Sequence, residues 1–189
     1  TAIILSPCVN THKEITEEIS NKKTSNASDR YQIMPIIRAL TRLNFNSRIF
    51  SLNKHYDISE IDVIPDPSIC IVGKMRSHPT LNDPNEYAQF HLCTALTLKR
   101  NGAKLITLYS DNVVARGSYD AELYKNLLYF SDWIITPTKV ISSYAENWAS
   151  SNTKIRCVKD PTLIKEQPFR EIDDTKKCNI IWFGHNQNF

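Results

Sequence analysis

Short apolar runs alternate with helical patterns along this chain. Several of the runs are continuously apolar, which is typical of strands covered on both faces of a parallel sheet. The alternation itself predicts parallel βαβ units. We predict seven strands, at Ala2–Leu5, Ser47–Ser51, Ser68–Gly73, Lys104–Tyr109, Trp133–Thr136, Lys154–Val158 and Asn179–Phe183.

Four helices are predicted between these strands. The first has Pro35 in its first turn, where a missing N–H costs nothing, and it places Ile36, Ile37, Leu40 and Leu43 on one face. The others span about Glu86–Arg100, Asp120–Phe130 and Lys139–Ala149, and Asn101-Gly102 is a left-handed helix stop. The predicted fold is therefore α/β and Rossmann-like, a mostly parallel sheet of about seven strands with helices on both faces.

Two segments depart from the alternation. The polar tract Asn10–Asp29 reads as a long loop, with a turn or two of helix at Glu14–Ser20. At the other end, the strand Asn179–Phe183 and the turn at Gly184 have nothing after them, so they cannot complete a βα unit. We therefore expect a domain at 1–177, with a polar connector at Thr162–Lys177, and the first strand of a truncated second domain at 178–189.

The composition bounds the class of protein. A chain of 189 residues, 41% apolar and 23% charged, is ordinary for a soluble domain with a sizeable core. A net charge of +3 without an RNP-like motif argues against nucleic acid, and no apolar run approaches the ~20 residues of a membrane span. The five widely spaced cysteines predict buried free thiols in a reducing cytosol rather than disulfides or metal ligands: Cys8, Cys70, Cys93, Cys157 and Cys178.

Several site motifs are missing from the sequence. The chain has only four glycines and contains neither GxGxxG nor a P-loop, which disfavours a self-contained dinucleotide or nucleoside-triphosphate site. It also has no HExxH, Cys/His cluster or GxSxG, which disfavours a zinc enzyme and a serine hydrolase.

Polar residues follow four predicted strands, at the edge where open parallel sheets bind ligands. Lys74 and Arg76 suit a phosphate or carboxylate, or are solvated loop charges. Asp111 suits hydroxyl binding or base catalysis beside Asn112, or the two form a common turn and cap pair. Ser6-Pro7 and Thr136-Pro137-Thr138 follow the other two strands.

Three further positions are weaker candidates. Arg30 and Tyr31 precede a helix, whose N-terminus suits an anion or sugar hydroxyls, although they also fit an ordinary helix start. His78 is a candidate general base, with a surface histidine as the simpler interpretation. His91 lies within a predicted helix and reads as a packed or partly exposed residue.

The order of the segments resembles the N-terminal half of GT-B glycosyltransferases, particularly bacterial family 4, or group 1, enzymes. The segments are SDRYQIMPIIRAL, a strand ending in GK, LKRNGAKLITLYSDN, YKNLLYFSDWIITPT, IRCVKDP and IIWFGHNQN. The resemblance covers essentially the whole chain, but its motifs are degenerate. Two departures stand out: Ser110-Asp111-Asn112 replaces a fuller acidic run, and the Asn10–Asp29 loop lacks a Gly-Gly pair.

The resemblance implies transfer of a hexosyl-type sugar from a nucleotide-sugar donor to an acceptor hydroxyl of a glycan, lipid or small molecule. For such a protein we predict Asp111 as the catalytic residue, for acceptor hydroxyl binding or base catalysis, and substrate contacts from the candidates Arg30, Tyr31, Lys74, Arg76 and Asn112. Gly184 and His185 would form a donor-phosphate turn. No metal or cofactor is implied, since basic groups and helix N-termini stabilise the departing diphosphate.

Most of the donor site would lie in the missing C-terminal domain, so this fragment alone should be inactive. The implied location is cytoplasmic, with peripheral membrane contact through Lys99, Arg100 and Lys104 left open. The alternative from the residues is a non-catalytic, flavodoxin-like binding or interaction module. In that case the final strand, Asn179–Phe183, belongs to the same sheet as the others.

Overall fold

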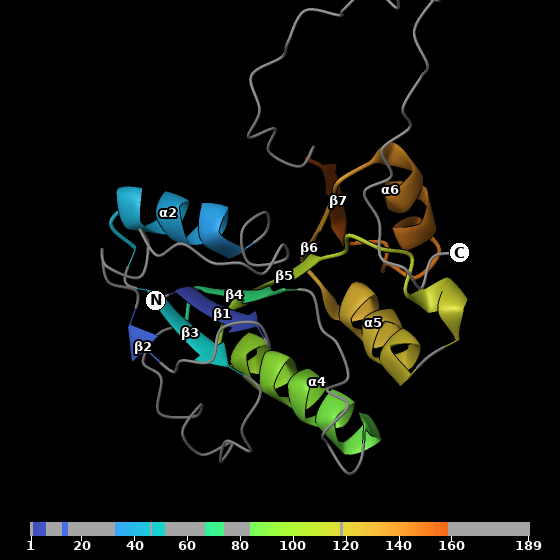
Figure 1. Ribbon diagram of the computed structural model, residues 1–189, viewed down its shortest axis with the longest axis horizontal. Helices are drawn as coiled ribbons and strands as arrows, with labels where there is room; N and C mark the ends of the chain where they lie inside the picture. Colours follow the sequence, from blue (N-terminus) through green and yellow to red (C-terminus); the bar gives the residue numbers. More distant parts are fainter. Residues whose placement is uncertain are drawn as a thin grey trace, which may run out of the picture.

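The computed structural model describes residues 2–6, 13–14, 33–45, 47–51, 67–73, 84–117 and 119–158. These residues form one sheet of seven strands in the order β2-β3-β1-β4-β5-β6-β7 (Figure 1). The six longer strands pair in parallel, and only β2 is antiparallel, against β3. The strands are β1 (Ala2–Ser6), β2 (Lys13–Glu14), β3 (Ser47–Ser51), β4 (Ile69–Val72), β5 (Lys104–Leu108), β6 (Trp133–Thr136) and β7 (Lys154–Cys157).

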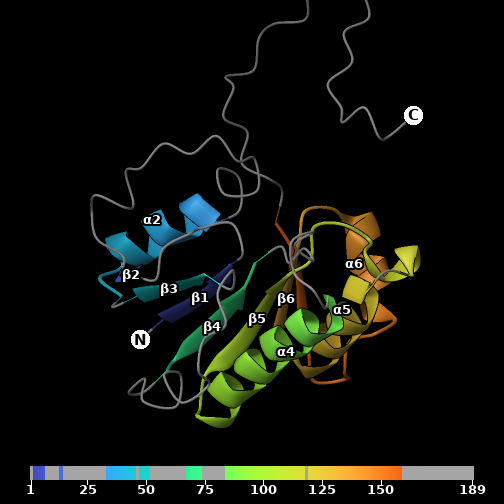
Figure 2. The same cartoon turned by 60° about the horizontal axis from the view of Figure 1, so that its bottom comes forward.

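Helices cover both faces of this sheet. Helix α2 (Met34–Arg42) lies on one face, and α4 (Pro84–Arg100) and α5 (Tyr119–Phe130) lie on the other (Figures 1 and 2). A short 3-10 helix, η2 (Val114–Arg116), precedes α5, and α6 (Lys139–Glu146) joins β6 to β7. The predicted α/β, Rossmann-like, mostly parallel fold is thereby confirmed.

The apolar strands bury alternate side chains in two separate cores. In β1, Ile4 packs beneath α2 with Ile37 and Leu40. Its neighbours Ile3 and Leu5 point to the opposite face, where they join the cluster formed with α4 and α5. Because both faces are covered, both sets of side chains must be apolar, and this explains the continuous apolar run at the start of the chain.

The predicted strands agree with the observed ones closely. The bounds of β3 and β6 are as predicted, and those of β1, β4, β5 and β7 differ by at most one residue at either end. The predicted strand at Asn179–Phe183 and the domain boundary near residue 177 lie outside the described residues. The prediction of loop and helix at Asn10–Asp29 is wrong at Lys13–Glu14, which form β2 because the edge of β3 offers them hydrogen-bonding partners.

Two helix ends also differ from the prediction. Leu43 is 68% exposed instead of lying on the buried face of α2. The reason is that α2 ends at Arg42, and the chain turns away through Asn44, whose φ of 54° is left-handed. Helix α6 ends at Glu146 rather than Ala149. The predicted stop after α4 is confirmed, because Gly102 has a φ of 99°.

Asp132 ties together four elements where β5, β6 and β7 begin. Its carboxylate accepts hydrogen bonds from Lys99 Nζ of α4 (2.7 Å) and from the Leu105 N–H of β5 (2.9 Å), and Lys104 Nζ lies 3.8 Å away. Its backbone bonds to both neighbouring strands, through Leu105 O and the Lys154 N–H. Burial acts to raise the pKa of Asp132, but the hydrogen bonds and the two lysines outweigh it and lower the pKa.

The cysteines divide by position in the sheet. Cys70, Cys93 and Cys157 are free thiols, as predicted, but only Cys70 is buried. The predicted burial of Cys157 is wrong because β7 is the last strand of the sheet that the described residues form, and that of Cys93 is wrong because α4 exposes it. Cys8 and Cys178 lie outside the described residues. Burial raises the pKa of the Cys70 thiol.

Among the described residues, no helix combines the length and apolar character needed to cross a bilayer.

Replacing Asp132 by Asn should lower the free energy of unfolding by about 1–2 kcal/mol at pH 7, because the amide keeps the shape but loses the charge-assisted bond to Lys99. A carboxyl with a lowered pKa contributes stability above its unfolded-state pKa, near 4, and loses it as the pH falls through the folded value. The wild-type advantage should therefore shrink below about pH 4 in urea unfolding. Glu122→Gln, on the exposed partner of Lys125, is the control and should change stability by less than about 0.5 kcal/mol; equal effects would contradict this role.

Alkylation of the native chain followed by peptide mass mapping should label Cys93 and Cys157 and spare Cys70. The thiolate is the reacting form, and burial both blocks the reagent and disfavours ionisation of Cys70. Cys70 should become labelled only in denaturant. Rapid native labelling of Cys70 would show that the sheet between β1 and β5 opens readily.

Candidate functional site

The carboxyl ends of the central strands lie at one edge of the sheet. Leu5, Val72, Thr107 and Ile134 pair in one continuous row across β1, β4, β5 and β6. Beyond that row the ladder continues for another step, since Gly73 N–H donates to Leu5 O and Tyr109 N–H donates to Ile135 O, each at 2.9 Å. These strand ends therefore share one edge. Of the polar residues predicted there, Asp111-Asn112 after β5 and Thr136–Thr138 at the end of β6 are described.

The best-defined polar group at this edge follows β5. The Tyr109 hydroxyl donates to Asn112 Oδ1 at 3.1 Å, and the Val114 N–H lies 3.5 Å from the same hydroxyl oxygen. The Val113 N–H donates to the Asp111 carbonyl oxygen at 2.8 Å, which closes the turn. Tyr109 is only 1% exposed and packs on Tyr124 of α5, with ring centroids 5.6 Å apart. The buried Tyr109 thus anchors the turn, whereas Asp111 and Asn112 are partly exposed.

The phenol of Tyr109 reports the electrostatics of this turn. Burial raises its pKa, and the nearby Asp111 carboxylate raises it further. The N–H groups of Val114 and Val113 act in the opposite direction, because they stabilise the phenolate, but they do not reverse the shift. The Asp111 carboxylate is therefore one of the groups that raise the pKa of this phenol.

The threonine hydroxyls at the end of β6 and directly after it have structural hydrogen-bonding partners. Thr138 caps α6, since its hydroxyl accepts the Ile141 N–H at 3.2 Å. Thr136 is buried, and its hydroxyl lies 2.6 Å from that of Ser142. These contacts give the Thr136-Pro137-Thr138 segment a structural role at the start of α6.

Only part of the predicted site falls within the described residues. Asp111 and Asn112 lie side by side at the end of β5. The other candidates, which include all the predicted basic contacts, lie outside these residues: Arg30, Tyr31, Lys74, Arg76, His78, Gly184 and His185. His91 is fully buried in α4, which confirms its interpretation as a packed residue. In the part of the chain that the structure describes, no three His, Cys, Asp or Glu side chains gather where they could hold a metal ion.

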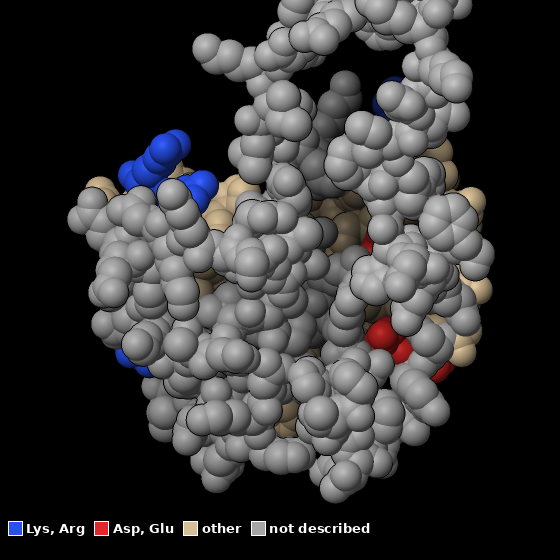
Figure 3. All heavy atoms as spheres, viewed as in Figure 1, with Lys and Arg blue, Asp and Glu red and all other residues tan. Residues whose placement is uncertain are grey.

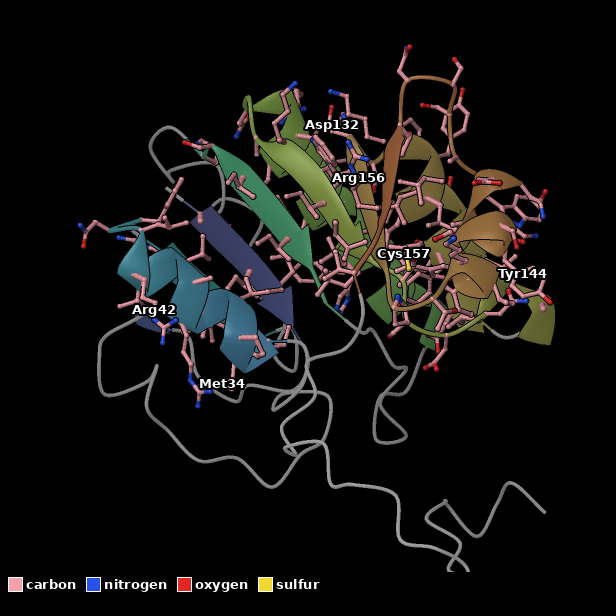
Figure 4. All side chains as sticks on the ribbon, turned by 90° about the horizontal axis from the view of Figure 1, so that it is seen from above. Met34, Arg42, Asp132, Tyr144, Arg156 and Cys157 are labelled. Carbon is pink, nitrogen blue, oxygen red and sulfur yellow. The ribbon has the colours of Figure 1, made fainter. Side chains whose placement is uncertain are left out.

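The cations considered for membrane contact have structural partners. Lys99 and Lys104 both contact Asp132, at the opposite edge from Asp111. On the sheet face that α2 shares, Lys154 Nζ and Arg156 Cζ of β7 lie 5.1 and 5.8 Å from the centre of the Trp133 ring. Figure 4 shows Arg156 over the half of the sheet that contains β6 and β7, and Arg42 over the half that α2 covers.

Figure 3 shows charged side chains on one face of the described surface. Blue side chains project at the upper left, above α2, whose exposed cations are Arg38 and Arg42, and red carboxylates lie at the right. A further blue group lies at the upper right, so basic groups are found on both sides of this view.

Sequence reasoning placed Tyr109 as the last residue of a strand and gave it no part in the site. The available signal was a large phenol directly before the polar run Ser110-Asp111-Asn112. A buried Tyr hydroxyl needs a hydrogen-bonding partner, and Asn112 is three residues away. Which atom Tyr109 would contact depends on the fold of the turn, and the structure supplies that contact.

No family model matches the chain, and no curated protein or solved structure shows significant similarity to it.

Asp111→Asn should lower the pKa of Tyr109, because the substitution removes a nearby negative charge. The pKa should nevertheless stay above the ordinary tyrosine value of about 10, since burial is unchanged. Selective ¹³Cζ-tyrosine labelling and NMR titration would resolve Tyr109 from the other tyrosines. An unchanged pKa in the variant would show that the Asp111 carboxylate points away from the phenol.

Proposed function

We propose that this chain is the acceptor-side domain of a glycosyltransferase that uses a nucleotide-sugar donor. The observation that carries the proposal is the Asp111-Asn112 pair, partly exposed at the carboxyl end of the central parallel strand β5. Open α/β sheets bind their ligands outside the carboxyl ends of their strands. The resemblance of the segment order to GT-B enzymes supplies the class of ligand and reaction.

The proposed chemistry assigns Asp111 to the acceptor. Its carboxylate accepts a hydrogen bond from the acceptor hydroxyl and takes the proton as the reaction proceeds. The acceptor oxygen forms a bond to the anomeric carbon of the donor, and the bond from that carbon to the diphosphate oxygen breaks. Asn112 holds a neighbouring polar group of the acceptor. The proton thus ends on Asp111 and the electron pair on the leaving diphosphate.

The remaining parts of the proposal come from the sequence candidates and from the resemblance. Arg30, Tyr31, Lys74 and Arg76 would contact anionic or sugar groups, and the Gly184-His185 turn would meet the donor phosphates. Basic groups and helix N-termini would offset the developing negative charge without a bound metal. A C-terminal domain would complete the donor site, acting in the cytoplasm on a glycan, lipid or small-molecule acceptor.

A flavodoxin-like binding module is the second candidate, and the strand order favours it. The segment β3-β1-β4-β5-β6 corresponds to 2-1-3-4-5 when the parallel strands are numbered along the chain, which is the flavodoxin-like order. In this alternative the ligand would occupy the crevice where β1 meets β4, and no sugar would be transferred. The two candidates therefore differ in whether turnover depends on Asp111.

The test is to recover the gene sequence downstream of Phe189 and to assay the longer product. The assay measures release of nucleoside diphosphate from a panel of nucleotide sugars with glycan and lipid acceptors. Asp111→Asn should lower turnover by about 100-fold or more, the usual contribution of a general base. Glu122→Gln, a matched acid-to-amide change on an exposed side chain of α5, should leave turnover unchanged. The 189-residue chain alone should give no turnover. Turnover that is insensitive to Asp111→Asn would refute the proposed role.

A further inference from the structure

The hydrogen bonds around Tyr109 determine which way the Asn112 amide faces. A backbone N–H can only donate, so the Val114 N–H directed at the Tyr109 oxygen makes that oxygen an acceptor. The phenol carries one proton of its own, and Asn112 Oδ1, 3.1 Å away, accepts it. The reverse orientation of the amide would direct a second N–H donor at the same oxygen and leave the phenol proton without this acceptor.

This arrangement turns Asn112 Nδ2 away from Tyr109. Asp111, the adjacent residue, carries a carboxylate, which only accepts hydrogen bonds, whereas Nδ2 only donates them. Both side chains are partly exposed, whereas Tyr109 is 1% exposed and fixed against Tyr124. The turn therefore combines a fixed donor with a neighbouring acceptor on a rigid base.

We infer that Tyr109 is a positioning residue that orients Asn112, so that Asp111 and Asn112 together bind two adjacent hydroxyls of a sugar ring. One hydroxyl donates to the Asp111 carboxylate, and its neighbour accepts from Asn112 Nδ2. A vicinal diol satisfies both groups, because each hydroxyl is both a donor and an acceptor. The inference rests on the proposed function. It adds that the acceptor is recognised through a vicinal diol and that Tyr109, which takes no part in the proposed reaction, orients Asn112.

The first arm of the test needs no ligand. In the 189-residue chain, Tyr109→Phe keeps the ring against Tyr124 and removes the hydroxyl. The Asn112 side-chain NH₂ resonances should shift and exchange faster with solvent. Tyr124→Phe removes the hydroxyl of the neighbouring buried tyrosine and should leave those resonances unchanged. Unchanged Asn112 resonances in Tyr109→Phe would overturn the positioning role whether or not the protein is a transferase.

The second arm measures sugar binding by NMR titration with methyl α-D-glucopyranoside. Tetrahydropyran-2-methanol, which has a similar ring but no diol, is the control ligand. The glucoside should bind and the control ligand should not. Tyr109→Phe should weaken binding by about five- to tenfold, and Asn112→Ala by at least as much, as expected for loss of an oriented hydrogen bond.

The double variant distinguishes positioning from general destabilisation. If Tyr109 acts through Asn112, adding Tyr109→Phe to Asn112→Ala should cause no further loss of affinity. Losses that multiply would overturn the inference. Equal binding of both ligands, or of neither, would overturn the diol specificity, and the Asp111 turnover assay on the longer gene product would still decide the proposed function separately.

Discussion

Parallel pairing is the constraint on which the rest of this structure depends. Two parallel strands cannot be joined by a tight turn, so each connection must cross a face of the sheet. The crossings place α2 over one face and α4 and α5 over the other, and they make both faces of β1 and β4 apolar. The same constraint brings the carboxyl ends of β1, β4, β5 and β6 to one edge. The ends of strands that are distant in the sequence thereby lie at one edge of the sheet.

The two edges of the sheet have different physical roles. Where β5, β6 and β7 begin, Asp132 binds Lys99 and the Leu105 N–H. Further along β5, the buried hydroxyl of Thr107 lies 2.7 Å from that of Ser131. These polar groups satisfy one another and connect neighbouring elements. At the carboxyl edge, the Tyr109 hydroxyl contacts the Asn112 amide and the Val114 N–H of the turn, and Asp111 is partly exposed. Asp132 lies directly before β6, and its contacts with α4, β5 and β7 give it a structural role.

Much of the fold was predictable because its signals are local. Alternate burial of Ile3 and Ile4 requires a continuous apolar run, and Gly102 and Pro35 mark helix ends through their own backbone preferences. The errors have non-local causes. Lys13–Glu14 form a strand only because the edge of β3 is available. Cys157 is exposed on β7, the last strand of the sheet among the described residues. Neither the pairing of β2 nor the position of β7 in the sheet can be derived from neighbouring residues in the sequence.

The site was predictable to a smaller extent. Asp111 and Asn112 are predicted as candidates because polar residues after a buried parallel strand lie at the edge where such sheets bind ligands. The contribution of Tyr109 was not found, since it depends on the turn that brings its hydroxyl to Asn112 Oδ1 and to the Val114 N–H. The chemistry of the site thus follows from residue types, whereas the direction in which the amide presents its donor follows from three-dimensional structure.

The central claim is that the carboxyl edge of β5 is where this domain binds a sugar. The most direct measurement is a map of backbone amide shift changes across the ¹⁵N-labelled chain as an oligosaccharide library is titrated. The account predicts that saturable changes are concentrated at Tyr109–Val114 and spare Asp132 and Lys154. Changes concentrated instead around Trp133 and Arg156, with the β5 turn unaffected, would contradict it.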